Sequence, residues 1–322
     1  MNNKELYLTF CKEQPKIPIF SQPWWLDAVC SDENWDVILI IRNNVIVASF
    51  PFYKSKKETI FGMNRIAMPI LTQKLGPFII YPPNQKIASK LSYEKEIFSE
   101  IINQIPKCDH LSINFDYYYT NWLPFYWNGF NQTTRYTYII EDLSNPKLLF
   151  DNFSENKRGD IRKAQKLVTI KYDLSCEEFL TYYCNSLSKL NDSLNYSKEL
   201  FRNIYESAHF RNQGKIIYAV GKENVEDIYG AIFYIWDAFS IYVLVTAFDP
   251  DFRTYAASSL LFYQIMVDNM NTGLKFDFEG SSIEKIENSY NKFGTKQVPF
   301  FVISKEYSRR FKVYSCLKEL FK

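Results

Sequence analysis

The sequence predicts a mixed α/β protein made of two domains of similar topology. Strand and helix patterns follow one another in the same order through each half of the chain. The closing segments also match, because strand, helix, Gly129-Phe130 and strand in the first half parallel strand, helix, Phe293-Gly294 and strand in the second. The length of 322 residues suits two domains of about 150 residues each. A repeat of this size indicates duplication and not a solenoid.

The first half opens with a short helix. Ser21 or Gln22 precedes Pro23, and proline favours the first turn of a helix, so we expect a helix that runs to about Val29. Periodicity and turn residues then predict these elements in order: strands 35–41 and 45–53, helix 93–105, strand 111–115, helix 122–127 and strand 136–140.

The second half repeats that order. Residues 228–248 are almost continuously apolar and long enough to cross a bilayer. Asp237 interrupts this run near its middle, where a charge would be costly in lipid but suits a turn. We therefore expect two buried strands joined as a hairpin. The predicted elements are strands 215–220, 228–235 and 239–246, helix 255–270, strand 274–278, helix 282–291 and strand 300–303.

The composition excludes several classes of protein. Lys and Arg number 38 and Asp and Glu 36, so any nucleic-acid contact must come from a local patch, and we expect no DNA binding. Two histidines and six cysteines without a CxxC pair leave little for a metal site or a Ser-His-Asp triad, and we expect no metal. Residues 1–16 contain no apolar signal segment, which favours a cytoplasmic protein with reduced cysteines.

A basic segment separates the two halves. We expect a first domain at 1–150, a connector helix within 151–172 and a second domain at 173–322. Two domains of one chain commonly leave a cleft whose rim the connecting helix lines, so the basic side chains could bind phosphates of a nucleotide- or lipid-linked acceptor or of a tRNA. The alternative is a solvated helix face. The side chains concerned are Lys157, Arg158, Arg162 and Lys163.

The start of the predicted helix 255–270 is a candidate phosphate site. Arg253 stands just before a run of small residues, Ala256, Ala257 and Ser258. The free N–H groups at a helix start can hold a phosphate where small side chains let it approach. Glycines at a helix start let a phosphate approach the backbone most closely. Alanines stand at these positions here, so the phosphate would be held less closely. The alternative is an ordinary helix start that packs on the sheet.

Two carboxylates follow the next predicted strand. Asp277 and Glu279 lie two residues apart and therefore on one face, where α/β sheets commonly open a cleft. A carboxylate in such a cleft can act as a base that takes a proton from a substrate, and a partly desolvated Glu suits that task. We expect Glu279 to be the base and Asp277 to support it. The alternative is that one of them caps a helix or pairs with Arg253.

Three further features are candidates for binding or catalysis. Lys292 is a fixed positive charge that could stabilise a developing oxyanion. Trp25 is either a platform on which a substrate stacks or a core anchor. Residues 308–322 predict a basic amphipathic helix, which either contacts an anionic membrane surface peripherally or packs on its own domain.

Four stretches carry a family resemblance, and they occur in order along nearly the whole chain. They are Phe20-Ser21-Gln22-Pro23-Trp24-Trp25-Leu26, the basic run from Lys157 to Ala164, the run from Phe276 to Ser281, and Lys292-Phe293-Gly294. Together they resemble the FemAB-like acyltransferases, which are tandem-domain members of the GNAT (Gcn5-related N-acetyltransferase) superfamily. The resemblance implies two tandem GNAT-like domains and a transferase without a tightly bound cofactor, whose donor substrate is an acyl-CoA or an aminoacyl-tRNA.

The best-known relatives transfer an amino acid from aminoacyl-tRNA to an amine of a peptidoglycan precursor. They tend to place a lysine shortly before the last strand, at a position that falls at Tyr290 or Asn291 here, while Lys292 lies nearer the glycine. The resemblance thus adds Asn291 to the expected substrate-binding residues. It leaves the donor open between a CoA thioester and a charged tRNA.

The leading functional hypothesis is an acyl- or aminoacyltransferase that acylates an amine of a cell-envelope or glycan precursor. Direct attack would occur in a cleft between the domains, with the donor bound by the second domain. The alternative is a non-enzymatic module that binds nucleic acid or a membrane surface. The basic connector and the 6 Trp, 24 Tyr and 27 Phe residues are compatible with that alternative.

Overall fold

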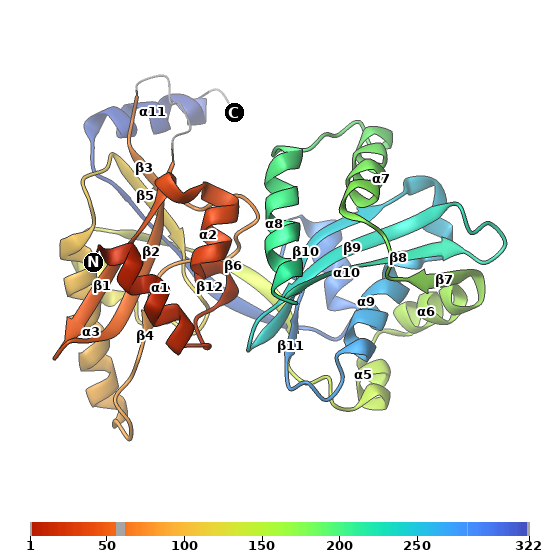
Figure 1. Cartoon of the computed structure of the whole chain (residues 1–322), viewed down its shortest axis with the longest axis horizontal. Coiled ribbons are helices and arrows are strands. Elements are labelled where there is room, and N and C mark those ends of the chain that lie inside the picture. Colours follow the sequence, from red (N-terminus) through yellow and green to blue (C-terminus); the bar gives the residue numbers. More distant parts are fainter. Residues whose placement is uncertain (1, 56–61, 282, 321–322) are drawn as a thin grey trace. The chain divides into compact units, whose positions relative to one another are not determined.

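Strands of mixed direction with helices packed against them form each of two units of the chain (Figure 1). The computed structural model describes residues 2–55, 62–281 and 283–320. The chain divides into two compact units. Unit 1 consists of Met1–Arg135 with Pro299–Lys322, and unit 2 consists of Tyr136–Val298.

Unit 1 has the strand order β1-β2-β3-β5-β12, with β4 beside β2. The paired strands are antiparallel except β3 and β5, which are parallel. Helices α1 and α2 pack against β1, and α3 contacts β1 and α4. The elements are α1 (Asn3–Glu13), α2 (Pro23–Cys30), β1 (Trp35–Arg42), β2 (Val45–Ser55), β3 (Arg65–Ala67), β4 (Phe78–Ile79), α3 (Ile87–Gln104), β5 (His110–Asn114), α4 (Leu123–Trp127), β12 (Lys296–Glu306) and α11 (Arg309–Leu320).

Unit 2 has the strand order β6-β11-β10-β9-β8-β7, in which β10 and β11 are parallel and the other pairs antiparallel. Helix α9 packs on β8 and β9, and α6 lies beside α9 (Figure 1). The elements are β6 (Asn131–Ile140), α5 (Pro146–Asn152), α6 (Glu155–Leu167), β7 (Val168–Lys171), α7 (Cys176–Lys189), α8 (Lys198–Phe210), β8 (Gly214–Gly221), β9 (Ile228–Trp236), β10 (Ser240–Phe248), α9 (Ala257–Asp268), β11 (Lys275–Asp277) and α10 (Glu284–Asn291).

The same succession of elements builds both units. A hairpin is followed by an antiparallel strand, a helix and a parallel strand, which is β1-β2-β3-α3-β5 in unit 1 and β8-β9-β10-α9-β11 in unit 2. The next strand comes from the other half of the chain. Residues Val302 to Glu306 of β12 pair with β5, whereas Ile139 and Ile140 of β6 pair with β11.

These exchanged strands explain why the units differ from the domains that we expected at 1–150, 151–172 and 173–322. The expected first domain runs to residue 150 and so includes the last part of β6, from Tyr136 onward. That part of β6 belongs to unit 2, where Ile139 and Ile140 pair with β11. The expected connector helix is α6, and it is not a separate linker. Ile161 and Ala164 of α6 are fully buried, and they belong to the core of unit 2 together with Ile140.

The long apolar run forms the predicted hairpin of β9 and β10. The Asp237 carboxylate closes the turn, because it accepts the N–H groups of Phe239 at 2.8 Å and of Ser240 at 3.0 Å. Within the described ranges, no helix has both the length and the apolar composition that a membrane crossing requires.

Trp25 is a core residue of unit 1, which agrees with the core-anchor alternative and not with a stacking platform for a substrate. Its side chain is fully buried, and its ring packs edge-on against Phe20 with ring centres 5.1 Å apart. The indole N–H donates to the Thr72 hydroxyl at 3.0 Å. No surface of this ring is left for stacking on a ligand.

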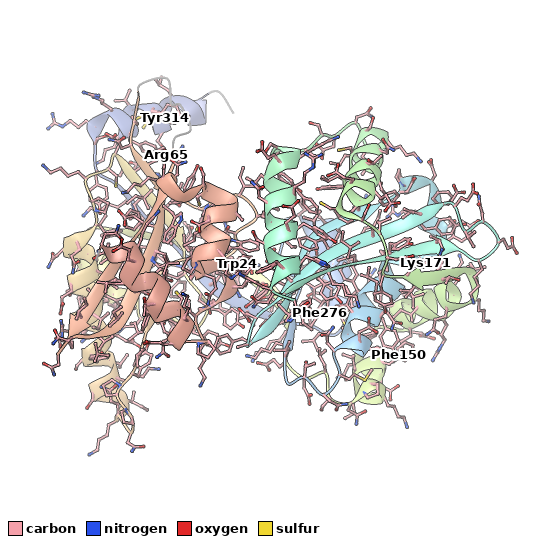
Figure 2. The ribbon with its side chains drawn as sticks, viewed as in Figure 1. Trp24, Arg65, Phe150, Lys171, Phe276 and Tyr314 are labelled. Carbon is pink, nitrogen blue, oxygen red and sulfur yellow. The ribbon has the colours of Figure 1, made fainter. Side chains whose placement is uncertain are left out.

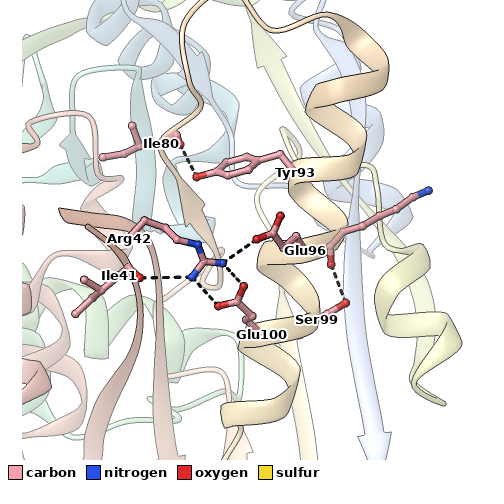
Figure 3. A network of polar contacts seen from close by, with 8 residues as sticks. Ile41, Arg42, Ile80, Tyr93, Glu96, Ser99 and Glu100 are labelled. Atoms are coloured by element: carbon pink, nitrogen blue, oxygen red, sulfur yellow. Dashed lines mark hydrogen bonds and ion pairs between the residues drawn. The ribbon is translucent and has the colours of Figure 1, made fainter. Parts of the chain in front are cut away.

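A polar network fastens α3 to the end of β1 in unit 1 (Figure 3). Arg42 donates to Glu96 Oε1 at 3.0 Å and holds Glu100 with both terminal nitrogens, one of them at 3.0 Å from Oε2. One arginine thus reaches two carboxylates that lie one turn apart on the helix.

The start of α11 packs on its own unit, which is one of the two alternatives for the C-terminal helix. Phe311 is buried and stacks on His110, with ring centres 4.1 Å apart. The Arg65 guanidinium lies 5.5 Å from the Phe311 ring, and Figure 2 shows Arg65 beside the helix that carries Tyr314. Residues 321–322 of the predicted helix lie outside the described part of the chain.

Candidate functional site

The N-terminus of α9 follows a reversal of the backbone. After β10 comes a 3₁₀ turn, Pro250–Tyr255, which Asp249 stabilises because its carboxylate accepts the N–H of Asp251 at 3.0 Å. Ala256 then adopts a left-handed φ of 56°, and α9 begins at Ala257 without a side-chain cap. The N–H groups of the first turn of α9 therefore point into the space in front of the helix.

Lys157 reaches this helix start from α6. Ser154 begins α6, because its hydroxyl accepts the N–H of Lys157 at 3.3 Å. The Lys157 side chain is buried and its ammonium donates to the hydroxyl of Ser259 at 2.9 Å. Burial lowers the pKa of Lys157, the Asp160 carboxylate opposes this shift, and the charge of Lys292 adds to it.

Helix α10 and the residue after it form a third wall. The Lys292 carbonyl accepts the N–H of Ser154 at 2.9 Å, which ties the end of α10 to the start of α6. Gly294 follows with a φ of 68°, and a Cβ there would lie 2.7 Å from the Asn152 carbonyl oxygen. Only glycine fits this close approach, which brings the end of α10 against α5 and α6.

These segments surround a cavity of about 520 Å³ within unit 2, which we call the basic cavity. Its lining includes four basic side chains and one carboxylate. Because Asp160 is the one carboxylate on the described lining, the excess of basic side chains favours a positive potential in front of the α9 N-terminus, whose dipole has the same sign. The basic side chains are Lys157, Arg253, Lys285 and Lys292.

The structure brings five predicted residues together at the basic cavity and adds others. The predicted residues on its lining are Arg253, Ala256, Ser258, Lys157 and Lys292. Ala257, also predicted, is buried in the core beneath them. Sequence reasoning missed Ser259, Lys285, Asn288 and Ser289. The α10 residues had a signal, because positions 285, 288, 289 and 292 share one face of a helix.

The other basic residues of the connector do not line the cavity. The Arg158 guanidinium donates to the Asp151 carbonyl at 2.8 Å. Arg162 is exposed and lies 5.4 Å from the Phe150 ring centre, and Lys163 is exposed. The expected cluster is therefore split between the cavity and the outer face of α6, with Lys157 alone of the four on the cavity.

Asp277 and Glu279 do not share a strand face, so that expectation is wrong. Strand β11 ends at Asp277, which is fully buried and accepts the Thr137 hydroxyl and the Glu279 N–H, the latter at 2.8 Å. Glu279 and Gly280 then take left-handed φ values of 61° and 64°. The buried Asp277 thus holds the turn that places Glu279 and is closed to a substrate.

Glu279 is half-buried and lies outside the lining of the basic cavity. Burial raises the pKa of Tyr290 to about 12, and the charge of Glu279 contributes to this shift. Asn291, a predicted substrate-binding residue, is exposed and donates to Glu287 on its own helix. It too lies off the cavity lining.

Comparison with known proteins finds similarity among solved structures. No protein-family model matches the sequence. No curated protein matches it either. The crystal structure of FemX superposes with a TM-score of 0.63 and 14% sequence identity, over 94% of this chain and 96% of that chain. The chain has a Fem-like fold.

A second solved structure agrees with this result. A conserved protein of unknown function from Bacteroides thetaiotaomicron VPI-5482 matches with a TM-score of 0.55 and 11% identity, over 92% of this chain and 96% of that chain. The Fem-like fold confirms the fold that the family resemblance of the sequence motifs implied. Because FemX is also covered almost completely, the likeness extends over both units.

Proposed function

We propose that this chain is an acyl- or aminoacyltransferase that binds a phosphate group of its donor in the basic cavity. The observation that carries the proposal is the meeting of four basic side chains with the N-terminus of α9. An acyl-CoA and an aminoacyl-tRNA both contain phosphates, so both fit this chemistry. The Fem-like fold supports the transferase class.

The proposed reaction is attack of an acceptor amine on the acyl carbon of the donor. A bond forms between nitrogen and carbon, and the bond from carbon to the thioester sulfur or the ribose oxygen breaks. Glu279 is the proposed base that takes the proton from the amine, and Asp277 positions it through the Glu279 N–H. Lys292 is proposed to hold the donor, because it lines the basic cavity.

The acceptor side of the proposal rests on the family resemblance. We propose an amine of a cell-envelope or glycan precursor, such as a peptidoglycan precursor, and a cytoplasmic site of action. Unit 1 would bind the acceptor or serve as a scaffold. The matching succession of elements in the two units supports an origin by duplication.

Thermal melting of the full chain with a panel of donors tests this proposal. A true ligand raises the melting temperature by mass action, and we expect this from an acyl-CoA or a charged tRNA. Binding of tRNA should weaken steeply with salt. Transfer to an amine acceptor should fall by about a hundredfold or more in Glu279→Gln. Binding without any transfer would instead favour the non-enzymatic module, and no shift with any donor would contradict the proposal.

A further inference from the structure

Helices α3 and α4 of unit 1 carry apolar side chains that lie in solvent. Ile87 and Leu91 stand four residues apart and therefore on one face of α3, and they are 82% and 42% exposed. Tyr126 and Trp127 at the end of α4 are 58% and 59% exposed, and Leu123 one turn earlier is also exposed. A single apolar side chain on a surface needs no explanation, but five on two neighbouring helices indicate an interaction site.

Contacts between α3 and α4 bring these exposed side chains onto one surface. Lys95 lies one turn beyond Leu91 on α3, and its ammonium lies 5.5 Å from the Trp127 ring centre. Phe98 of α3 and Phe125 of α4 are buried and pack together, with ring centres 5.4 Å apart. We call the exposed set the α3–α4 surface, and its members are Ile87, Leu91, Leu123, Tyr126 and Trp127.

The chain around the α3–α4 surface has an excess of positive charge. Residues 117–134 contain no charged residue, and the charged residues within 75–93 are Lys86 and Lys90. Glu94 is the first carboxylate of α3, but it is buried and accepts hydrogen bonds on both oxygens. The next two carboxylates of α3 take part in the arginine network of Figure 3. The whole chain is nearly balanced, with 38 basic and 36 acidic residues, so the excess is local.

We propose that the α3–α4 surface docks this chain peripherally on a membrane that contains anionic lipids. Trp and Tyr side chains suit the boundary between lipid head groups and acyl chains, because each has an apolar ring and a polar group that stays hydrated. The aliphatic side chains of the surface insert beside the rings, and the neighbouring lysines reach the lipid phosphates. A second copy of this chain fits less well, because two such surfaces would bring like charges together. The inference goes beyond the proposed function, since it needs neither a donor nor an acceptor.

Co-sedimentation of the full chain with lipid vesicles tests this inference. We expect binding to mixed vesicles of phosphatidylglycerol and phosphatidylcholine, weaker binding at high salt, and little binding to phosphatidylcholine alone. Trp127→Ser should weaken binding to the mixed vesicles about tenfold, because a ring at the lipid interface is lost. Phe210→Ser is the matched control, since Phe210 is an exposed ring of unit 2, and it should bind as the wild type does.

A second pair of variants compares the α3–α4 surface with the C-terminal helix α11. Ile87 and Val313 are both exposed aliphatic side chains, so both serine variants should melt as the wild type does. Ile87→Ser should weaken binding to the mixed vesicles by about fivefold or more, and Val313→Ser should leave it unchanged. The reverse result would place the membrane contact on α11 and overturn the inference.

Sedimentation equilibrium without lipid tests the other occupant of the surface. We expect a wild-type chain that does not self-associate through α3 and α4. A dimer that Trp127→Ser dissociates would assign the surface to a second copy of this chain and overturn the inference. Failure to bind either kind of vesicle would overturn it as well. Transfer from a donor in solution without vesicle binding would leave the proposed function standing, and vesicle binding without transfer from any donor gives the reverse result.

Discussion

The position of Glu279 depends on two left-handed residues and a buried acceptor, and not on the strand before it. A Cβ at Gly280 would lie 2.1 Å from the Tyr136 carbonyl oxygen, and the φ of Gly280 is 64°. The strand pattern at 274–278 predicts β11 but carries no information on this turn, because the turn depends on contacts with β6. The sequence therefore predicted strand β11 correctly, whereas the expectation that Asp277 and Glu279 share a strand face was wrong.

Gly280→Ala should destabilise the protein strongly. We expect a loss of at least about 2 kcal/mol in the free energy of unfolding, from the left-handed backbone and the contact with the Tyr136 carbonyl. Gly159→Ala is the matched control, because its Cβ would meet open space on helix α6 and should stabilise by about 0.5–1 kcal/mol. Urea unfolding measures both, and equal effects would show that the turn is not constrained.

His110 makes the stability of unit 1 depend on pH. Burial lowers the pKa of His110 to about 4, and the charge of Arg65 acts in the same direction. The unfolded chain takes up the proton near pH 6.5 and the folded chain only near pH 4, so the free energy of unfolding should fall as the pH drops between these values. Above pH 6.5 this penalty is absent.

A proton NMR titration of the imidazole signals checks this directly. The chain contains two histidines, so His209→Asn assigns the remaining signal to His110. We expect that signal to titrate near pH 4. A midpoint near the ordinary value of 6.5 would contradict the burial of His110 under Phe311.

Among the elements, strands were predicted better than helices. The hairpins β1-β2 and β8-β9 have apolar runs and tight turns that the sequence shows locally. Four helices, α1, α5, α7 and α8, were missed, although Asn2, Asn145, Ser175 and Ser197 cap them through side-chain hydrogen bonds. Polar residues in the first turns and on the exposed faces of these helices obscure the helical periodicity of their apolar residues. The caps were the better signal.

At the same scale, the attachment of α3 to β1 should depend on Arg42. Its side chain is 38% exposed, and Glu100 is 33% exposed, so we expect Arg42→Ala to lower the free energy of unfolding by about 1 kcal/mol, less at high salt. Lys54→Ala is the control, since the Lys54–Asp36 pair is more exposed and is joined by one hydrogen bond. Urea unfolding at low and high salt measures both. Equal losses in the two variants would contradict a special role of the Arg42 network.

For the whole molecule, the sequence predicted the repeated order of elements but not the exchange of the closing strands. Residues 136–140 and 300–303 are both short, mainly apolar strand patterns, so nothing local shows which neighbouring strand each of them pairs with. The complete lining of the basic cavity could not be predicted from the sequence for a related reason. Its walls come from α6, the start of α9 and α10, and only tertiary packing brings Lys157, Ser259 and Lys285 together.

The exchange predicts which fragment can fold alone. Residues 136–298 contain all strands of the unit 2 sheet from Tyr136 onward and should unfold cooperatively as an isolated fragment. Residues 173–322 lack β6, α6 and β7, including the buried Ile140, Ile161 and Val168, and should not. Circular dichroism during urea unfolding compares the two fragments. Cooperative unfolding of the second fragment alone would contradict the observed division into units.

We propose that an acyl donor binds at the start of α9. Amide hydrogen exchange of the full chain, with and without a donor that raises its melting temperature, tests this most directly. The account predicts slower exchange at residues 256–260 and at the start of α6, with little change in the exposed part of α8. Protection confined to other segments, with residues 256–260 unchanged, would contradict it.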